Sequence, residues 1–222
     1  MFAGIDLWLD SGPREPASQM AVDEVLLTNG LSRPLLRHYR WLGRAASFGV
    51  SQSHAASSAH APGFQLVRRW TGGGLVRHDS DWTFSLLIPR GEVLAGGRPR
   101  DSYAAIHSCV ARALREAGID VSPVPECGSL SGPVCFSSPV LHDLVDPAGR
   151  KICGGAQRRS RDGLLHQGSI QNVNLTLDFL PVFAAASARR IFEFNVPPRL
   201  EAAVSQLAAA KYANPAWMTR IA

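Results

Sequence analysis

The spacing of apolar and polar residues predicts a chain in which strands and helices are interspersed. In several short stretches apolar residues alternate with polar ones, and a period of two is typical of strands with one buried face. One further stretch is almost continuously apolar, which also favours a strand. The strands expected in the first half are residues 5–10, 35–41, 64–70 and 82–89, with residues 47–53 as a short strand or turn.

Helical spacing occurs in four stretches. In the first, Ser18 is expected to cap a helix that ends at Asn29–Gly30, where glycine is a common stop. In the second, residues 101–117, apolar residues recur at helical spacing, and Cys109 beside them is interpreted as a small core residue. Further helices are expected over residues 177–190 and 198–211.

The second half of the chain contains a long irregular segment followed by three strands. Residues 122–139 are dense in proline, glycine and serine, and a loop of that length is usually functional or mobile. A meander of three strands is expected over residues 140–146, 151–159 and 164–171. The mixed order predicts an α+β fold with a largely antiparallel or mixed sheet and flanking helices. No interior linker divides the chain, so a single domain over residues 1–222 is expected, with no accessory C-terminal domain.

Composition and charge narrow the setting and the partners. The 222 residues are 45% hydrophobic and 18% charged, which is ordinary for a globular protein with its own core. The N-terminal residues lack a basic segment, and no apolar run approaches about 18 residues, so we expect a soluble cytoplasmic protein. The net charge of +5 favours an acidic partner, which is either a nucleic acid or an acidic protein.

The four cysteines do not form a metal-binding pattern. Cys109, Cys127, Cys135 and Cys153 contain no CxxC pair, and the seven histidines are scattered. We therefore expect no zinc site, and without a secretion signal we expect no disulfide framework.

Two glycine-rich stretches are the candidates for chemistry. In the first, TGGG follows Arg68 and Arg69 and is followed by His78 and an aspartate. Glycine N–H groups can reach the oxygens of a phosphate or carboxylate, and on a strand only one of the two arginines can face that site. The stretch matches neither GxxxxGK[ST] nor GxGxxG, so a P-loop and a dinucleotide fold are disfavoured.

The second stretch is GRKICGGAQRR, which holds one of only two lysines among 23 basic residues. On a strand, Lys151 and Cys153 share a face, and Gly154–Gly155 permits close approach of the backbone. From these residues alone, Lys151 is either a functional lysine or a solvated strand end.

Together these motifs resemble the lipoate-protein ligase A and octanoyltransferase family, within the biotin/lipoate ligase catalytic-domain superfamily. The resemblance implies one α+β catalytic domain with an apolar tunnel for an eight-carbon acyl chain beneath the TGGG turn. The similar stretches follow the family's order along nearly the whole chain: QMAVDEVLL (19–27), LRHYRW (36–41), SFGVSQ (47–52), VRRWTGGGLVRHD (67–79), WTFSL (82–86), GRKICGGAQRR (149–159), LLHQGSI (164–170) and KYANPAW (211–217).

Residue roles follow from matching the family's motifs. Lys151 matches the lysine that contacts the activated acyl group. The family usually has histidine next to glycine where this chain has LHQGS, so an exchange of roles between His166 and Gln167 stays open. The residues implied to bind the substrate are Arg69, Thr71, Gly72, Gly73, Gly74, His78, Gly154, Gly155, His166 and Gly168.

The family contains two mechanisms. A ligase activates lipoate with ATP and Mg²⁺ and passes lipoyl-AMP to the acceptor lysine. A transferase moves octanoyl from acyl carrier protein onto a cysteine and then onto that lysine, with no cofactor and no metal. The implied acceptor is a lipoyl domain of a 2-oxoacid dehydrogenase complex or the glycine cleavage H protein. Asp81–Trp82 favours the transferase, and the expected absence of an accessory domain favours either the transferase or a ligase that needs a separate partner chain. TGGG favours the ligase, and we favour the transferase.

Cys135 is the candidate nucleophile, because it resembles the cysteine of the cysteine-dependent octanoyltransferases. A free thiol with a pKa near 8.5 is only about 3% ionised at pH 7. An ammonium about 4 Å away supplies up to about 4 kcal/mol toward the thiolate, so Lys151 alone is sufficient to activate Cys135. Three alternatives stay open: a ligase with a structural Cys135, an inactive relative, and a non-catalytic or nucleic-acid-binding module that uses Arg158, Arg159 and Arg161.

Overall fold

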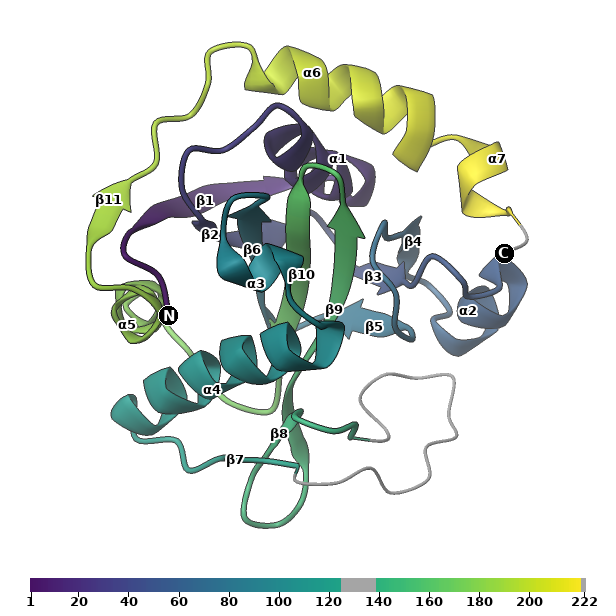
Figure 1. Ribbon diagram of the computed structural model, residues 1–222. Coiled ribbons are helices and arrows are strands. Elements are labelled where there is room, and N and C mark those ends of the chain that lie inside the picture. The colour runs from purple at the N-terminus through teal and green to yellow at the C-terminus, as the bar shows by residue number, and fades with distance from the viewer. Residues whose placement is uncertain (125–138, 221–222) are drawn as a thin grey trace.

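Two β-sheets and the helices packed on them make up the described part of the chain (Figure 1). The structure is a computed structural model that describes residues 1–124 and 139–220. The strands are β1 (Ile5–Arg14), β2 (Leu35–Trp41), β3 (Ala45–Phe48), β4 (Gln65–Arg68), β5 (Val76–His78), β6 (Trp82–Pro89), β7 (Ser122–Pro123), β8 (Leu144–Val145), β9 (Lys151–Ser160), β10 (Gly163–Ile170) and β11 (Ile191–Glu193). The helices are α1 (Pro16–Thr28), α2 (His54–His60), α3 (Val93–Gly96), α4 (Pro99–Glu116), α5 (Phe179–Ser187), α6 (Leu200–Leu207), the π-helical turn η1 (Ala208–Tyr212) and α7 (Pro215–Met218).

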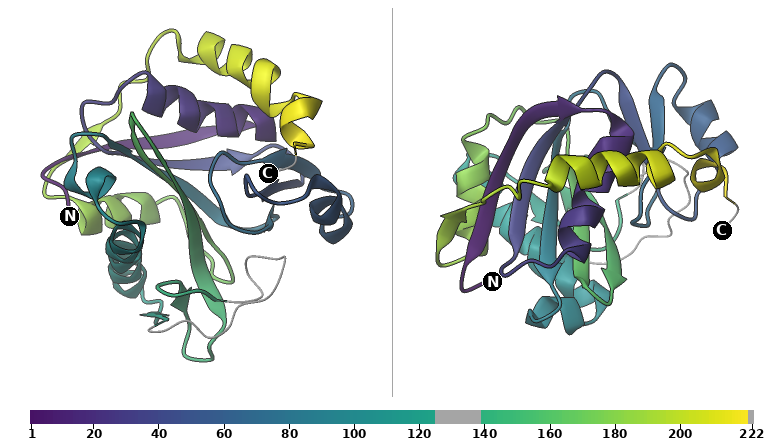
Figure 2. Two further views of the ribbon diagram at one scale, coloured as in Figure 1. Left: turned by 45° about the vertical axis from the view of Figure 1, so that its right-hand side comes forward. Right: turned by 90° about the horizontal axis from the view of Figure 1, so that it is seen from above.

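The larger sheet has the strand order β11–β1–β2–β6–β10–β9–β8–β7. Strands β11, β1 and β2 pair in parallel, and each later pair of neighbours is antiparallel. The smaller sheet, in the order β4–β3–β5, lies beside the β9–β10 hairpin (Figures 1 and 2). The predicted α+β fold with a mixed, largely antiparallel sheet is therefore confirmed.

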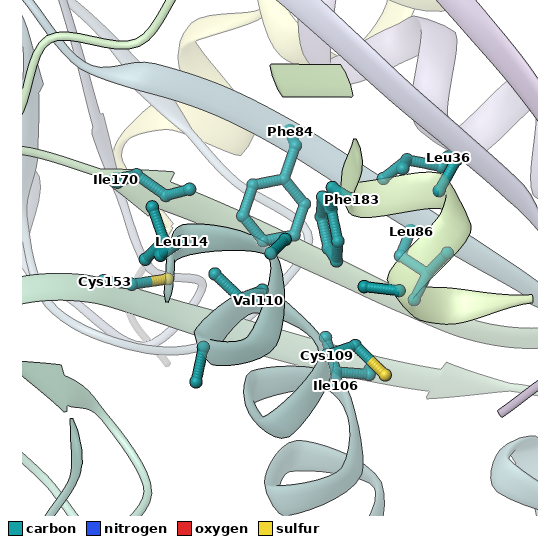
Figure 3. Close-up of a cluster of buried hydrophobic side chains, with 14 of the residues drawn as sticks. Leu36, Phe84, Leu86, Ile106, Cys109, Val110, Leu114, Cys153, Ile170 and Phe183 are labelled. Atoms are coloured by element: carbon teal, nitrogen blue, oxygen red, sulfur yellow. The ribbon is translucent and has the colours of Figure 1, made fainter. Parts of the chain in front are cut away.

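Helices cover both faces of the larger sheet. Helices α4 and α5 pack on one face over a core that includes Phe84 and Phe183, and α1 and α6 cover the other face (Figures 2 and 3). Strand β6 contributes to both cores, because Phe84 and Leu86 belong to the first and Leu87 to the second. A strand buried on both faces has a continuous apolar run instead of a strict alternation. This explains the sequence of residues 82–89 and confirms the strand predicted there.

The first helix begins earlier than predicted. Helix α1 starts at Pro16 after the N-cap residue Glu15, so Ser18 lies inside the first turn and the predicted cap is wrong. Proline suits that position because its fixed φ is helical and it has no N–H to leave unpaired. The predicted end is confirmed, since Asn29 is the C-cap residue and Gly30 has a φ of 86°.

The elements of the second half agree with the prediction in order and differ in length. Strands β8, β9 and β10 form the expected antiparallel meander, although β8 is reduced to two residues. Helix α4 confirms the helix expected over residues 101–117. Residues 47–53 contribute only the end of β3, and α2 follows them without having been predicted. No helix in residues 1–124 and 139–220 is long and apolar enough to span a membrane.

Candidate active site

A narrow pocket opens between the β9–β10 hairpin, the smaller sheet and the inner face of β2. The empty space between its walls is about 390 Å³, which includes a part open to solvent. Its wall is mainly apolar. The lining residues are Met20, Tyr39, Trp41, Ser47, Arg69, Val76, His78, Thr83, Gly154, Gly155, Ala156, Gln167, Gly168 and Ser169.

Arg69 holds the TGGG turn beside this pocket. Its guanidinium donates to the carbonyl oxygens of Gly72 and Gly74, each at 2.8 Å. It also donates to the carbonyl and the hydroxyl oxygen of Ser47, at 2.7 and 2.9 Å. Arg68 is buried elsewhere, where it donates to backbone carbonyls that include those of residues 50 and 218. One arginine therefore serves the pocket, as the alternation of the strand predicts.

The middle glycine of the turn requires its lack of a side chain. Gly73 has a φ of 83°, a left-handed conformation that glycine adopts without strain. A Cβ built there would lie 3.3 Å from Nη2 of Arg69, whereas a Cβ at Gly72 would meet nothing within 4 Å. Glycine is therefore required at position 73 by the left-handed backbone conformation of the turn.

A buried chain of hydrogen bonds connects the turn to the protein core. Thr71 donates its hydroxyl to Oε1 of Gln167 at 2.7 Å, and Gln167 donates to Oδ2 of Asp23 at 2.8 Å. The other oxygen of Asp23 pairs with Nη1 of Arg37 at 2.7 Å, and both side chains are 0% exposed. Arg37 also pairs with Asp10 at 2.6 Å. Buried charges are costly unless they are paired and hydrogen-bonded. This network of hydrogen bonds therefore fixes the position of the Gln167 amide on the pocket wall.

Three side chains beside the pocket form a hydrogen-bonded line. Oγ of Ser47 lies 2.7 Å from Nε2 of His78, and Nδ1 of His78 lies 2.8 Å from Oδ2 of Asp81. Asp81 also accepts from the hydroxyls of Ser169 at 2.6 Å and Thr83 at 2.9 Å. Burial alone would raise the pKa of Asp81, but its interaction with His78 and the hydrogen bonds from the hydroxyls of Ser169 and Thr83 lower it. Asp81 is therefore an ionised acceptor at neutral pH.

Lys151 forms a buried ion pair at the edge of the pocket wall. Its Nζ lies 2.7 Å from Oδ2 of Asp143, and the two side chains are 2% and 0% exposed. Tyr103 donates to Oδ1 of Asp143 at 2.6 Å, and its hydroxyl accepts from the N–H of Gly155 at 3.0 Å. Burial and then the charge of Asp143 raise the pKa of Tyr103, so its hydroxyl stays protonated. A Cβ at Gly154 would lie 2.7 Å from Nζ, which shows that Lys151 rests against the backbone of the pocket wall.

Comparison with known proteins identifies the family. The model of the lipoyl protein ligase A/B catalytic domain matches residues 15–214. The chain belongs to this family. It is 35% identical over 183 residues to octanoyltransferase LipM of Oceanobacillus iheyensis, and the match covers 77% of this chain and 66% of that protein. The LipM of Staphylococcus aureus is 34% identical over 179 residues, covering 73% of this chain and 64% of that protein. The matched segment thus spans just under two thirds of these relatives.

Solved structures of the family share the fold of this lipoyl protein ligase A/B domain. A lipoate protein ligase of T. acidophilum with bound lipoic acid has a TM-score of 0.76 at 21% identity, covering 99% of this chain and 100% of that chain. A lipoate-protein ligase A bound with ATP has a TM-score of 0.76 at 20% identity and covers 100% of both chains. These likenesses confirm the predicted lipoate ligase-like fold.

His166 is the predicted binding residue that this lipoyl protein ligase A/B domain does not bring to the pocket. It faces α4, with its ring 5.6 Å from that of Tyr103 and 5.4 Å from that of His107, whereas Gln167 lines the pocket. Nε2 of both histidines has no hydrogen-bond partner within the described residues. Burial lowers the pKa of His107 to about 4 and that of His166 well below its usual value, so both are neutral at pH 7. Gln167 has the pocket-facing position that an exchange of roles implied.

The other predicted residues are placed as follows. Arg69, His78, Gly154, Gly155 and Gly168 line the pocket. Thr71, Gly72, Gly73, Gly74 and Lys151 lie beside it through the contacts given above.

The cysteines divide into two groups. The predicted nucleophile Cys135 lies outside the described residues, as does Cys127. Cys109 and Cys153 are buried in the core under α4, which confirms the core role predicted for Cys109 (Figure 3). Burial raises the pKa of Cys109, so it is a poor nucleophile.

Sequence reasoning did not identify Asp143, Tyr103 or Ser47 as parts of the site. Asp143 precedes a strand of only two residues, and Tyr103 reads as one apolar position of an amphipathic helix. The stretch VLHDLV did contain a signal, because Asp143 is the one acidic residue in a mainly apolar segment. An aspartate in such a segment is rarely buried unless it has a charged partner.

Proposed function

We propose that this protein transfers an octanoyl group from acyl carrier protein to a lysine of a lipoyl domain, through a thioester on Cys135. The observation that carries the proposal is the apolar pocket whose glycine-lined wall adjoins the buried Lys151–Asp143 pair. The identity to the two LipM octanoyltransferases supports the same assignment. No cofactor is needed, because a thioester already carries an activated acyl group.

The lining of the pocket is suited to an unbranched acyl chain. Its wall combines Met20, Tyr39, Trp41 and Val76 with the backbone of three consecutive residues of β9. Burying each methylene contributes about 0.8 kcal/mol, so an octanoyl chain gains on the order of 5 kcal/mol from the wall alone. This binding places the carbonyl carbon at one end of the chain, which is where the chemistry occurs.

Lys151 supplies the positive charge for two steps. In the first, the Cys135 thiolate attacks the carrier thioester, the new C–S bond forms, and the carrier thiolate leaves and takes up a proton. In the second, the neutral amine of the acceptor lysine attacks, a C–N bond forms, the C–S bond to Cys135 breaks, and the amine proton passes to the expelled sulfur. Negative charge develops on the carbonyl oxygen in both steps, and a fixed ammonium stabilises it. Asp143 and Gly154 hold that ammonium in one position.

Charge supports an acidic acceptor. The chain carries a formal net charge of +5 and a pI of about 9.4. We propose as acceptors the lipoyl domains of 2-oxoacid dehydrogenase complexes or the glycine cleavage H protein, with the reaction taking place in the cytoplasm. Complementary charge mainly accelerates encounter, so transfer should slow as salt is raised.

The test is intact-mass analysis of an apo lipoyl domain under two conditions. One mixture holds octanoyl-acyl carrier protein without ATP, and the other holds free octanoate or lipoate with ATP and Mg²⁺. Modification in the first mixture alone is the expected result, and modification in the second alone would mean an ATP-dependent ligase. Lys151→Ala should abolish transfer. Lys211→Ala is the matched control, since Lys211 is the other lysine of the chain, pairs with Glu24 and does not line the pocket.

A further inference from the structure

We propose that Ser47 is a second nucleophile in this protein, activated by His78 and Asp81, and that it gives the pocket an ester- and thioester-hydrolysing activity separate from transfer through Cys135. The three residues form the hydrogen-bonded line described above, with distances of 2.7 Å and 2.8 Å. A hydroxyl, an imidazole and a carboxylate in this order are the arrangement that turns a weakly acidic alcohol into an acyl acceptor.

The direction of each hydrogen bond follows from chemistry. Asp81 is an acceptor only, so Nδ1 of His78 carries the proton between them. In the neutral imidazole Nε2 is then the acceptor, and the hydroxyl of Ser47 donates to it. This is the tautomer in which the imidazole can remove the serine proton. The hydroxyls of Ser169 and Thr83 on Asp81 fix the carboxylate and thereby the imidazole ring. Trp41 stacks on that ring at 4.2 Å between centroids.

Arg69 adds the positive charge that a nucleophilic serine needs. Its Nη1 donates to Oγ of Ser47 at 2.9 Å, so the guanidinium lies beside the atom that would carry the developing alkoxide. The same charge stabilises the oxyanion formed when a carbonyl carbon bonds to Oγ. Ser47, His78 and Arg69 all line the pocket, where an acyl chain has an apolar wall to bind.

The fold produces this arrangement through strand pairing. Ser47 on β3 pairs with Val76 on β5, which makes His78 its diagonal neighbour on the same face. Asp81 follows β5 after a short turn, which returns its carboxylate to the far nitrogen of the ring. All three side chains are buried, and a low local dielectric strengthens the hydrogen bonds between them.

The reaction needs no reactant other than the substrate and water. Oγ of Ser47 bonds to the carbonyl carbon, its proton passes to Nε2 of His78, and the C–O or C–S bond of the substrate breaks. His78 gives the proton to the leaving alkoxide or thiolate. Water then attacks the serine ester while His78 takes a water proton, the C–Oγ bond breaks, and Ser47 regains its proton. The products are a carboxylic acid and an alcohol or thiol.

The test uses an alkyl fluorophosphonate with an octyl chain, which phosphonylates activated serines with loss of fluoride. We expect the full chain to be labelled on the peptide that contains Ser47 and to hydrolyse p-nitrophenyl octanoate. Ser47→Ala should remove the label and lower hydrolysis at least about 100-fold. Asp81→Asn should slow labelling by a similar factor, because the amide presents a donor to Nδ1 and reverses the tautomer. Ser51→Ala, at an exposed serine, is the matched control and should be labelled like the wild type.

Two results would overturn the proposal: no labelling of the folded wild-type protein, or labelling and hydrolysis that persist at wild-type rates in Ser47→Ala. Thermal unfolding of each variant confirms that it is folded when measured. A second readout separates this proposal from the proposed function. After incubation with octanoyl-acyl carrier protein, neutral hydroxylamine removes a Cys135 thioester and leaves a Ser47 ester. Peptide masses before and after this treatment therefore show separately whether Cys135 and Ser47 carry the octanoyl group.

Discussion

Nζ of Lys151 lies 2.7 Å from Oδ2 of Asp143, with neither side chain more than 2% exposed. Asp143 immediately precedes β8 and Lys151 begins β9, and these two strands are neighbours in the sheet. Breaking a buried ion pair from one side is costly because the remaining charge loses its partner. The pair therefore fixes the position of the Lys151 ammonium.

Replacing Asp143 with Asn removes the countercharge of Lys151. We expect the free energy of unfolding to fall by about 3 kcal/mol. Transfer should fall about 100-fold, because the ammonium loses the position from which it meets the carbonyl oxygen. Urea unfolding and the rate of acceptor modification measure the two effects. Asp120→Asn, at an exposed site, should change neither, and a wild-type transfer rate in Asp143→Asn would contradict the role given to the pair.

Gly154→Ala tests the contact between the lysine and the pocket wall. The added Cβ would lie 2.5 Å from Cε and 2.7 Å from Nζ of Lys151, so the end of the side chain must move. Because that end can shift without moving the backbone, we expect a stability loss of only about 1 kcal/mol. The transfer rate should nevertheless fall about 100-fold. Gly91→Ala, where the added atom meets nothing within 4 Å, controls for glycine replacement.

The TGGG turn offers a comparison between adjacent glycines. Gly73→Ala forces an alanine to a φ of 83° and should cost about 1–2 kcal/mol of unfolding free energy. Gly72→Ala adds a Cβ in open space and should leave stability within about 0.5 kcal/mol of wild type. Thermal and urea unfolding of both variants measure the two losses of stability. Equal losses would show that the left-handed conformation is not what requires glycine.

His107 predicts a loss of stability on acidification. Burial lowers its pKa from 6.5 to about 4, so between these values the unfolded chain binds a proton that the folded chain does not. Stability is then fully present above pH 6.5 and is lost as the pH falls toward 4, by about 3 kcal/mol in total. His166 acts in the same direction.

Urea unfolding at pH 7 and pH 4.5 measures the effect of His107. The difference between the two pH values should be smaller in His107→Gln than in the wild type by roughly 2–3 kcal/mol. His60→Gln, at an exposed histidine, is the matched control and should keep the wild-type difference. An unchanged difference in His107→Gln would show that this imidazole does not resist protonation.

Much of the fold was predictable because it depends on local periodicity. Residues 82–89 and 101–117 carry their strand and helix patterns within their own sequence, and the structure has β6 and α4 there. The start of α1 was wrong because serine and proline both favour helix beginnings, and here Pro16 has the first helical position, which leaves Ser18 inside the helix. Propensity at a helix end distinguishes such candidates poorly.

The site was less predictable because its contacts cross the fold. Alternation says that His166 and Gln167 face opposite sides of β10, but the pocket side is decided by where the smaller sheet packs. The Ser47–His78 bond depends on the register between β3 and β5, and the Lys151–Asp143 pair on an irregular register between β8 and β9. The sequence motifs identified Lys151 and His78 as site residues. Their hydrogen-bond and ion-pair partners became visible only in the packed sheets.

The first measurement for the proposed transfer is peptide mapping of the protein after brief incubation with octanoyl-acyl carrier protein, without acceptor, ATP or Mg²⁺. We expect an octanoyl thioester on the peptide that contains Cys135, removed by neutral hydroxylamine and absent in Cys135→Ala. Addition of an apo lipoyl domain should discharge it onto the acceptor lysine. An unacylated Cys135, with an acceptor that becomes modified only when ATP, Mg²⁺ and a free acid are supplied, would contradict the transferase assignment.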